Sequence, residues 1–294
     1  MQSISIVGIG RLGGALALAL SKAGYRIDNL VYRSRPVPEE VVGRISPQPH
    51  LVSFRDLDEL RSDIVFITSA DPEIESISSQ LAARVKNSPL VFHTSGSLSS
   101  GILSGLADAG FGTGSMHPLI SVSDPIRGSE QFAGAYFCIE GRDDATAAAK
   151  AIVTDLGGES FSIEPQFKPL YHASAVTASG HLVALVDTAS EMLSNCGVEP
   201  AMAKRILMPL IKSTVTNLDN QSNREALTGT FARADIAAFE RHMDALNRSA
   251  SSEMRRVYLE LGMRSLALAD HHGNLSERSH ELEKRIKLAL QSGR

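Results

Sequence analysis

The feature that most constrains this chain is a glycine motif near its start, Gly8-Ile9-Gly10-Arg11-Leu12-Gly13. Residues 3–7 before the motif alternate and carry β-branched side chains, as a buried strand does, and residues 12–23 after it follow a helical pattern. Between a strand and a helix, the first glycine allows the tight turn, the second lets the backbone approach a pyrophosphate, and the third lets helix and strand pack closely. The helix N-terminus favours the anionic phosphates. The motif therefore predicts a dinucleotide site, with a glycine-rich turn in another kind of α/β protein as the alternative.

The end of the second expected strand indicates which dinucleotide binds. NAD-binding chains place an Asp or Glu about twenty residues beyond the glycines to hold the ribose 2′-hydroxyl. Here residues 27–32 form that strand, and Arg33-Ser34-Arg35 follow it. Two guanidinium groups and a hydroxyl suit a 2′-phosphate in charge and in geometry, whereas the carboxylate of Asp28 lies too early in the strand. We expect NADP as the cofactor; a solvated basic loop is the alternative.

Composition excludes several classes of protein. The net charge of −4 over 294 residues gives no electrostatic reason for binding nucleic acid or an anionic membrane. Two distant cysteines, Cys138 and Cys196, provide neither a disulfide framework nor a metal site. Residues 173–186, the least charged helical stretch, are too few and too rich in Ser, Thr and His to span a bilayer. Because the first strand also leaves no room for a signal peptide, we expect a cytoplasmic enzyme without a bound metal.

The order of the expected elements predicts two domains. Residues 1–165 alternate strand and helix patterns, which is typical of a parallel, doubly wound α/β sheet, whereas residues 166–294 contain only long helical stretches. We therefore expect an N-terminal Rossmann domain that binds NADP, followed by an all-helical domain that binds substrate and dimerises. A homodimer is expected because the second domain has more apolar residues than one small bundle needs to bury. These residues include Ile206, Leu207, Leu210, Ile211, Val257, Leu261 and Leu268.

Ligands of such sheets bind beyond the carboxyl ends of the strands. Ser69 ends the third expected strand, residues 63–69, Ala70 follows it, and we expect both to contact the cofactor. Ser95 and Ser97 flank a glycine after the next strand, where their hydroxyl and backbone groups suit a nicotinamide amide or a substrate. His117 ends a later strand and is a candidate substrate residue. The alternative for His117 is a structural anchor of its loop.

The first helix of the second domain carries two candidates for proton transfer. Lys168 and His172 share one face of this helix, where the chain passes from sheet to helices. His172 suits a general acid, since histidine titrates near neutral pH, and Lys168 suits polarisation of a carbonyl or binding of a carboxylate. Ser95 is the third catalytic candidate. The alternatives are a structural histidine between the domains and a lysine at a solvated helix start.

A later turn, residues 227–235, offers a further substrate contact. Thr228 and Arg233 can reach a substrate carboxylate if this turn faces the crevice. Asp235 is the expected N-cap of the helix that follows. For Arg233, pairing with Asp235 or Glu240 on the surface is the favoured alternative.

Several of these segments together resemble one family. Besides the glycine motif, they are His93-Thr94-Ser95-Gly96-Ser97, Gly114-Ser115-Met116-His117-Pro118-Leu119, Tyr171-His172-Ala173-Ser174-Ala175-Val176 and the turn at residues 227–235. In this order they resemble the Rossmann-like proteins with a C-terminal domain of unknown function 2520. Thr230 and Ala234 stand where that family usually has proline and glycine, so the geometry of the turn is in question.

The resemblance carries implications of its own. The wider superfamily is similar to pyrroline-5-carboxylate reductase, ketopantoate reductase and 6-phosphogluconate dehydrogenase, which implies an NADP-linked reductase or dehydrogenase whose helical domain builds a homodimer. In the β-hydroxyacid relatives a lysine near the place of Lys168 acts as the acid. His172 stands where those relatives have Asn, so that role is not carried over.

The expected function is NADP-dependent oxidation or reduction of a small carbonyl or imine substrate that bears a carboxylate. Two alternatives stay open, a non-catalytic NADP-binding sensor or regulator and a deazaflavin-linked NADP oxidoreductase. A substrate-sized pocket beside the nicotinamide position favours the enzyme, whereas a closed apolar wall there favours the sensor. The identity of the substrate does not follow from the sequence.

Overall fold

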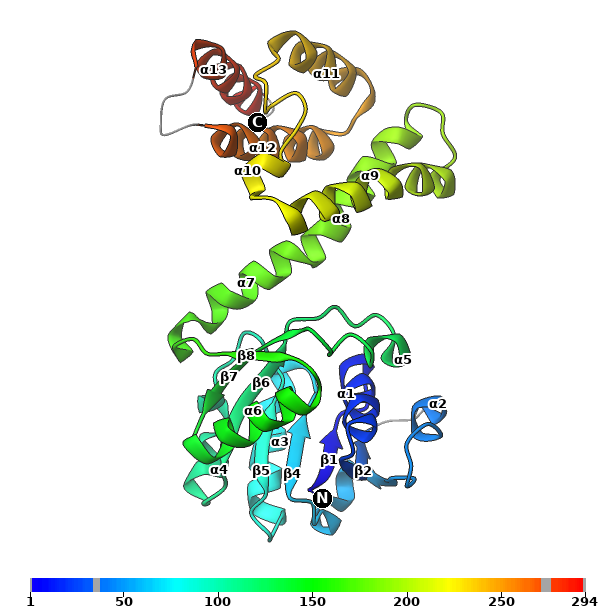
Figure 1. The fold of residues 1–294 in the computed structure, drawn as a ribbon, viewed down its shortest axis with the longest axis vertical. Helices are drawn as coiled ribbons and strands as arrows, with labels where there is room; N and C mark the ends of the chain where they lie inside the picture. Colours follow the sequence, from blue (N-terminus) through cyan, green and yellow to red (C-terminus); the bar gives the residue numbers. More distant parts are fainter. Residues whose placement is uncertain (1, 34–37, 271–275, 293–294) are drawn as a thin grey trace. The chain divides into compact units, whose positions relative to one another are not determined.

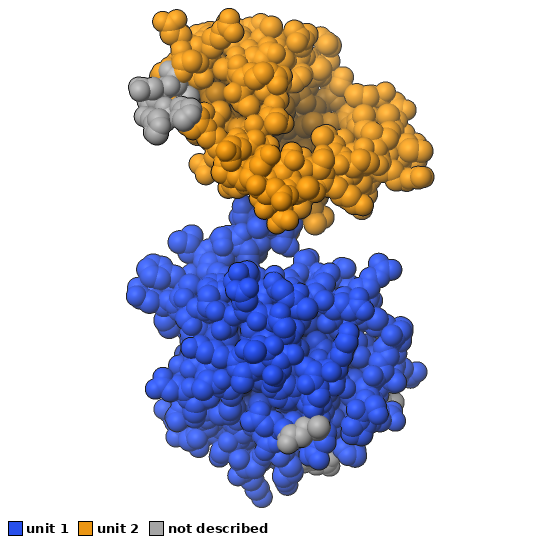
Figure 2. Space-filling view, in the orientation of Figure 1, with its two compact units in different colours: residues 1–179 blue, residues 180–294 orange. Residues whose placement is uncertain are grey.

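The structure is a computed structural model that describes residues 2–33, 38–270 and 276–292. The chain divides into two compact units, residues 1–179 and residues 180–294 (Figure 2). Within the described ranges, no helix combines the length and the apolar character that crossing a membrane requires.

The described part of the first unit is built on an eight-stranded sheet (Figure 1). The strands are β1 Ser3–Val7, β2 Arg26–Tyr32, β3 His50–Ser53, β4 Ile64–Ile67, β5 Leu90–His93, β6 Thr113–Pro118, β7 Tyr136–Gly141 and β8 Glu159–Phe161. Their order is β3-β2-β1-β4-β5-β6-β7-β8, and all neighbours run parallel except β6 and β7. This confirms the predicted doubly wound sheet. The order reverses between β1 and β4, and sheets of this kind bind ligands at the carboxyl ends of those strands.

Helices cover both faces of the sheet. The helices described in this unit are α1 Arg11–Lys22, α2 Glu39–Val42, α3 Asp71–Arg84, α4 Ser104–Asp108, α5 Pro125–Gly128, α6 Asp143–Asp155 and α7 Lys168–Ala178, with 3₁₀ helices at Phe54–Glu59, Ser100–Leu103 and Pro165–Phe167; of α7, only Lys168 is buried. Side chains of α1 and α6 pack in one hydrophobic core, and those of α3 and α4 pack in another. Strand β4 supplies both cores alternately, because Ile64 and Phe66 belong to the first and Val65 and Ile67 to the second. Burial on both faces explains why this strand is apolar throughout.

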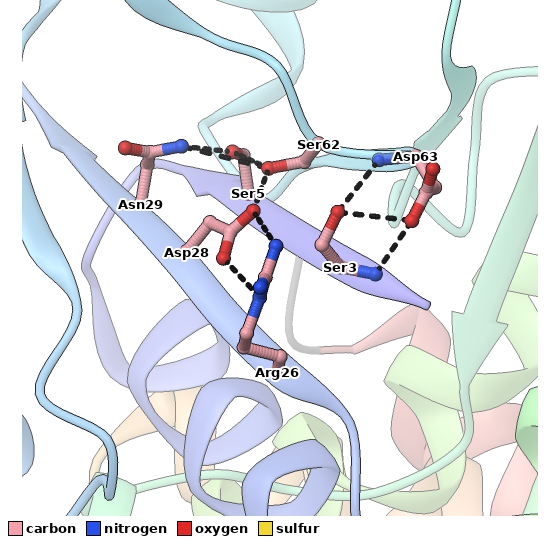
Figure 3. A network of polar contacts seen from close by, with 7 residues as sticks. All are labelled: Ser3, Ser5, Arg26, Asp28, Asn29, Ser62 and Asp63. Carbon is pink, nitrogen blue, oxygen red and sulfur yellow. Dashed lines mark hydrogen bonds and ion pairs between the residues drawn. The ribbon is translucent and has the colours of Figure 1, made fainter. Parts of the chain in front are cut away.

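A polar network joins β1 and β2 to the chain entering β4, on the side where these strands begin (Figure 3). The carboxylate of Asp63 accepts hydrogen bonds from the backbone N–H and the hydroxyl of Ser3, at 2.8 and 2.9 Å. These bonds hold the pKa of Asp63 below its ordinary value. Asn29 donates to the Ser5 hydroxyl at 2.9 Å, and the hydroxyls of Ser5 and Ser62 are 2.6 Å apart. The network satisfies polar groups of the sheet away from the carboxyl ends, so its role is structural.

The second unit is helical wherever the structure describes it (Figure 1). Its helices are α8 Gly180–Ser194, α9 Pro200–Asn220, α10 Asn223–Ala226, α11 Ile236–Ser249, α12 Ser252–Ala269 and α13 Glu277–Gln291. Helices α11, α12 and α13 share a small hydrophobic core that includes Phe239, Leu259 and Ile286. Helices α8 and α9 pack against each other. The all-helical character predicted for this half of the chain is confirmed.

Helix α7 belongs with the sheet. We expected the domain boundary after residue 165, whereas the compact units divide after residue 179. The physical reason lies at the start of α7, where Lys168 is fully buried and donates hydrogen bonds to Ser115 of β6 and to the backbone of Ser95. A helical pattern in a sequence does not show which core the helix packs against.

Candidate functional site

The glycine turn after β1 has the geometry that a dinucleotide site requires. Gly8 has a φ of +102°, in the left-handed region that favours glycine. A Cβ on Gly13 would lie 2.1 Å from the carbonyl oxygen of Gly8, so a side chain does not fit there. A Cβ on Gly10 would meet no atom of the described residues within 4 Å, so these residues leave the space in front of the turn open. A different physical requirement therefore explains why glycine stands at each of these three positions.

Helix α1 begins directly at this turn. Its first residue is Arg11, its N-cap is Gly10, and no side-chain hydrogen bond from the described residues caps it. Its first turn contains no acidic residue. Free N–H groups and the helix dipole together favour an anion at such an end. The predicted cofactor residues Ile9 and Leu12 flank this helix start, and Ile9 lines the cavity in front of it.

A cavity of about 360 Å³ adjoins the glycine turn. The predicted cofactor residues Ser69 and Ala70, which follow β4, line it. Arg33, which follows β2, lines the same cavity. The structure thus brings these residues together with the glycine turn. The predicted residues Ser34 and Arg35 lie outside the described residues.

The same cavity contains a carboxylate that sequence reasoning missed. Glu73, in the first turn of α3, forms an ion pair with Arg33. The guanidinium of Arg33 also lies 5.2 Å from the ring centroid of Phe54. Strands β2 and β4 both neighbour β1, so the strand order brings the chain after β2 close to the helix after β4. The only sequence signal for Glu73 is an acidic residue in a first helical turn, which is common in helices of any function.

A second group of polar side chains lies at the carboxyl ends of β5 and β6. Strand register places His93 of β5 beside Ser115 of β6. Lys168 donates to the Ser115 hydroxyl at 2.8 Å and to the carbonyl of Ser95 at 3.3 Å, and its side chain is fully buried. Burial lowers the pKa of Lys168 below its ordinary value. Lys168 therefore fastens the loop after β5 to both β6 and α7.

The loop after β5 is held by its own serines. The Ser95 hydroxyl accepts hydrogen bonds from the backbone N–H groups of Ser97 and Leu98, at 3.2 and 3.1 Å. Ser97 donates from its hydroxyl to Asp71 at 2.6 Å, which joins the loop to the start of α3. The Ser95 N–H donates to Nδ1 of His93 at 3.2 Å, and burial lowers the pKa of His93 to about 4. A neutral histidine and two serines thus fix this loop beside α3.

Three polar aromatic rings gather next to Gly96 in this loop. Nδ1 of His117 and the hydroxyl of Tyr171 are 2.6 Å apart. The rings of His117 and His172 stand edge to face, with their centroids 5.8 Å apart. A Cβ on Gly96 would lie 2.5 Å from Cδ2 of His172 and 2.8 Å from Nε2 of His117, so these rings approach the loop because residue 96 is glycine. The structure therefore brings the predicted residues His117 and His172 together and adds Tyr171, which sequence reasoning did not select.

Burial sets the protonation of this group. Burial, followed by the charge of Lys168, lowers the pKa of His117 to about 4. Burial also raises the pKa of Tyr171 above its ordinary value. At neutral pH the tyrosine is therefore protonated and the imidazole is neutral. We assign the tyrosine hydroxyl as the donor to Nδ1, which places the imidazole proton on Nε2. That assignment leaves His117 with an N–H donor on the side of Gly96.

The predicted substrate residue Thr228 lies in the second unit. It is exposed in the turn between α10 and α11, and Arg233 is exposed in the same turn. Asp235 accepts a hydrogen bond from the N–H of Ala238 at 2.9 Å, which confirms its predicted role as N-cap of α11. Ala234 has a φ of +48°, which explains why glycine is usual there in the family that the chain resembles. A role for Thr228 in substrate binding stays a prediction.

Comparisons with known proteins agree with this architecture. Residues 1–118 match a Rossmann-like domain, and residues 135–265 match a domain of unknown function, DUF2520. A search of curated protein sequences finds no match.

Solved structures share the fold. A provisionally assigned NADP oxidoreductase from Bacteroides fragilis is similar with a TM-score of 0.74 and 21% identity, over 90% of this chain and 98% of that one. A protein from Thermotoga maritima has a TM-score of 0.63 and 21% identity, over 98% of both chains. A pyrroline carboxylate reductase from Plasmodium falciparum, solved with NADP bound, has a TM-score of 0.59 and 13% identity, over 92% of this chain and 98% of that one. At these identities the likeness shows the fold.

Proposed function

Because this chain is a Rossmann-like protein with a C-terminal domain of unknown function 2520, we propose that it is an NADP-dependent oxidoreductase. Its substrate in this proposal is a small carbonyl or imine compound that bears a carboxylate. One observation carries the proposal, the hydrogen bond of 2.6 Å from Ser97 to Asp71. This bond joins the loop of the histidine cluster to the start of α3, whose first turn lines the cofactor cavity through Glu73. A dinucleotide at the glycine turn and a substrate at the histidines are therefore neighbours.

The residues present fit NADP. The uncapped start of α1 and the open space at Gly10 suit a pyrophosphate. Arg33 suits a 2′-phosphate, and Ser34 and Arg35 stay predicted partners of the same group. Bound NADPH supplies the hydride. The pyrroline carboxylate reductase with this fold was solved with NADP bound, which supports the choice of cofactor.

In this proposal the side chains of the protein orient the substrate and supply a proton. In this proposal His172 donates a proton to the oxygen or nitrogen of the reduced group, since its ring is partly exposed beside Gly96. His117 donates a hydrogen bond from Nε2 to the substrate, and the Tyr171 hydroxyl holds it in the required tautomer. Ser97 stays a predicted substrate contact.

Lys168 and Ser95 act in this proposal as positioning residues. Both were candidates for direct catalysis from the sequence. Lys168 is fully buried, and the hydroxyl of Ser95 already accepts two backbone hydrogen bonds within its loop. Together they fix the loop on which the rings of His117 and His172 pack. These contacts support His172 over Lys168 as the proton donor.

We also propose a homodimer formed by the second unit. Among the described residues, α8 has no buried side chain and α9 has only Ala203. Apolar side chains stay exposed on both helices, with Val183 at 71% and Leu210 at 63% exposure. A cavity of about 640 Å³ along the two helices is lined by Leu182 and Met208 among others. Exposed apolar surface of this kind is typical of a protein interface.

A metabolite screen that follows the absorbance of NADPH tests the proposed function. The protein is incubated with NADPH and with pools of small oxo acids, aldehydes and imines. The control is Gly10→Asp, which places a carboxylate where the pyrophosphate is expected and where a Cβ has no atom of the described ranges within 4 Å. We expect turnover with the native protein and none with the control. Binding of NADPH without turnover of any pool would support a sensor instead.

A further inference from the structure

The cofactor cavity holds a guanidinium and a carboxylate side by side. Arg33 and Glu73 both line it and form an ion pair with each other. Their side chains are 52% and 38% exposed, so a ligand in the cavity has access to both. The two groups come from different elements, Arg33 from the end of β2 and Glu73 from the first turn of α3.

The position of Glu73 is fixed by its helix. Its backbone N–H donates to the carbonyl of Ala70 at 2.9 Å, and α3 is anchored in the core through Ile74 and Ile77. The guanidinium of Arg33 is held between this carboxylate and the ring of Phe54, whose centroid is 5.2 Å away. The ion pair is thus a feature of the cavity wall.

The two groups have opposite preferences for the 2′ position of an adenosine ribose. A guanidinium binds a 2′-phosphate by charge and by bidentate geometry. A carboxylate repels that phosphate but accepts a hydrogen bond from a 2′-hydroxyl. A 2′-phosphate must therefore compete with Glu73 for Arg33, whereas a 2′-hydroxyl has an acceptor available beside it.

We propose that Glu73 sets the choice between NADP and NAD in this chain. The inference rests on the proposed dinucleotide site. The sequence has no carboxylate directly after β2, where NAD-binding chains have one, and Glu73 supplies that group from α3. In this proposal the native protein accepts both dinucleotides, because the charge of Glu73 lowers the preference for a 2′-phosphate that Arg33 alone would give.

Two small nucleotides that differ only in the 2′-phosphate test whether Glu73 affects recognition of the ribose. The affinities of adenosine 2′,5′-bisphosphate and of adenosine 5′-monophosphate are measured by calorimetry for the native protein and for Glu73→Gln, and the titrations are repeated with NADP⁺ and NAD⁺. Because the variant removes a like charge and frees Arg33, we expect its preference for the 2′-phosphate to rise about tenfold over native. Arg33→Gln should lower the same preference below native.

Glu75→Gln is the matched control. Glu75 is an exposed residue of the same helix, it carries the same charge, and it is not among the residues that line the cavity. In Glu75→Gln, the ratio of the affinities for adenosine 2′,5′-bisphosphate and adenosine 5′-monophosphate should equal the native ratio. Thermal melts should show that Glu73→Gln, Arg33→Gln and Glu75→Gln all fold. An unchanged ratio in Glu73→Gln, with both probes bound, would overturn the inference and leave the proposed function standing. Failure of the native protein to bind either dinucleotide would overturn the proposed function as well.

Discussion

The buried histidine at the end of β5 makes the stability of this protein depend on pH in a defined direction. His93 is fully buried, and burial, followed by the charge of Lys168, lowers its pKa from 6.5 to about 4. In the unfolded chain the residue takes up a proton near pH 6.5, whereas in the folded chain it does so only near pH 4. The contribution of neutral His93 to stability is therefore fully present above pH 6.5 and is lost as the pH falls toward 4.

The magnitude follows from the two pKa values. One pKa unit corresponds to ~1.4 kcal/mol, so a shift from 6.5 to about 4 amounts to roughly 3 kcal/mol once the pH is below both values. Between pH 7.5 and pH 5, the free energy of unfolding should fall by about 2 kcal/mol through this residue alone. The informative variant is His93→Asn. Its side-chain oxygen can replace Nδ1 as the acceptor of the Ser95 N–H, now 3.2 Å away, and it does not titrate.

Urea unfolding followed by circular dichroism at pH 7.5, 6 and 5 measures the effect. Over this range the native protein should lose about 2 kcal/mol more stability than His93→Asn. His50→Asn is the matched control, because His50 is an exposed histidine of β3 and its variant should follow the native curve. Equal pH dependence of the native protein and His93→Asn would refute the reasoning.

Three further predictions concern the cofactor, the chemistry and the assembly. Replacing Arg33 and Arg35 together by Ala should weaken NADPH more than NADH in a fluorescence titration, because both cations are proposed to face the 2′-phosphate; equal weakening would show that they do not. His172→Asn should keep NADPH affinity within a few-fold and lower turnover by ~10²–10⁴, the usual contribution of a general acid; unchanged turnover would leave this histidine a structural role. Light scattering should report a dimer, and Leu210→Asp should report a monomer because it charges an apolar surface; a monomeric native protein at micromolar concentration would contradict the proposed assembly.

The parts of this fold that depend on local pattern could be predicted from the sequence. The glycine motif indicated the turn and the start of α1 because the steric requirements at its glycines involve residues close by in the chain or the neighbouring strand. The apolar run of β4 indicated a strand buried on both faces, and Asp235 indicated the start of α11 because an N-cap acts within three residues.

Contacts between distant segments could not be predicted in the same way. Glu73 reaches Arg33 only because β1 lies between β2 and β4 in the sheet. The order of strands in a sheet cannot be predicted from the local periodicity of the sequence. No local pattern marks Tyr171 as a polar contact, because its hydroxyl meets His117 of β6 only where the first residues of α7 lie beside the end of that strand. The same packing explains why the boundary between the two units follows α7.

Calorimetric titration of NADPH into the native protein and into Gly10→Asp tests the central claim most directly. The glycine turn leaves open space at residue 10 beside an uncapped helix start, and a carboxylate there opposes a pyrophosphate without disturbing the fold. We predict saturable binding by the native protein, and binding at least ~100-fold weaker by the variant at an unchanged melting temperature, because charge-assisted contacts are lost and a like charge is added. Absence of binding by the native protein, or equal binding by the two proteins, would contradict the assignment of this turn as a dinucleotide site.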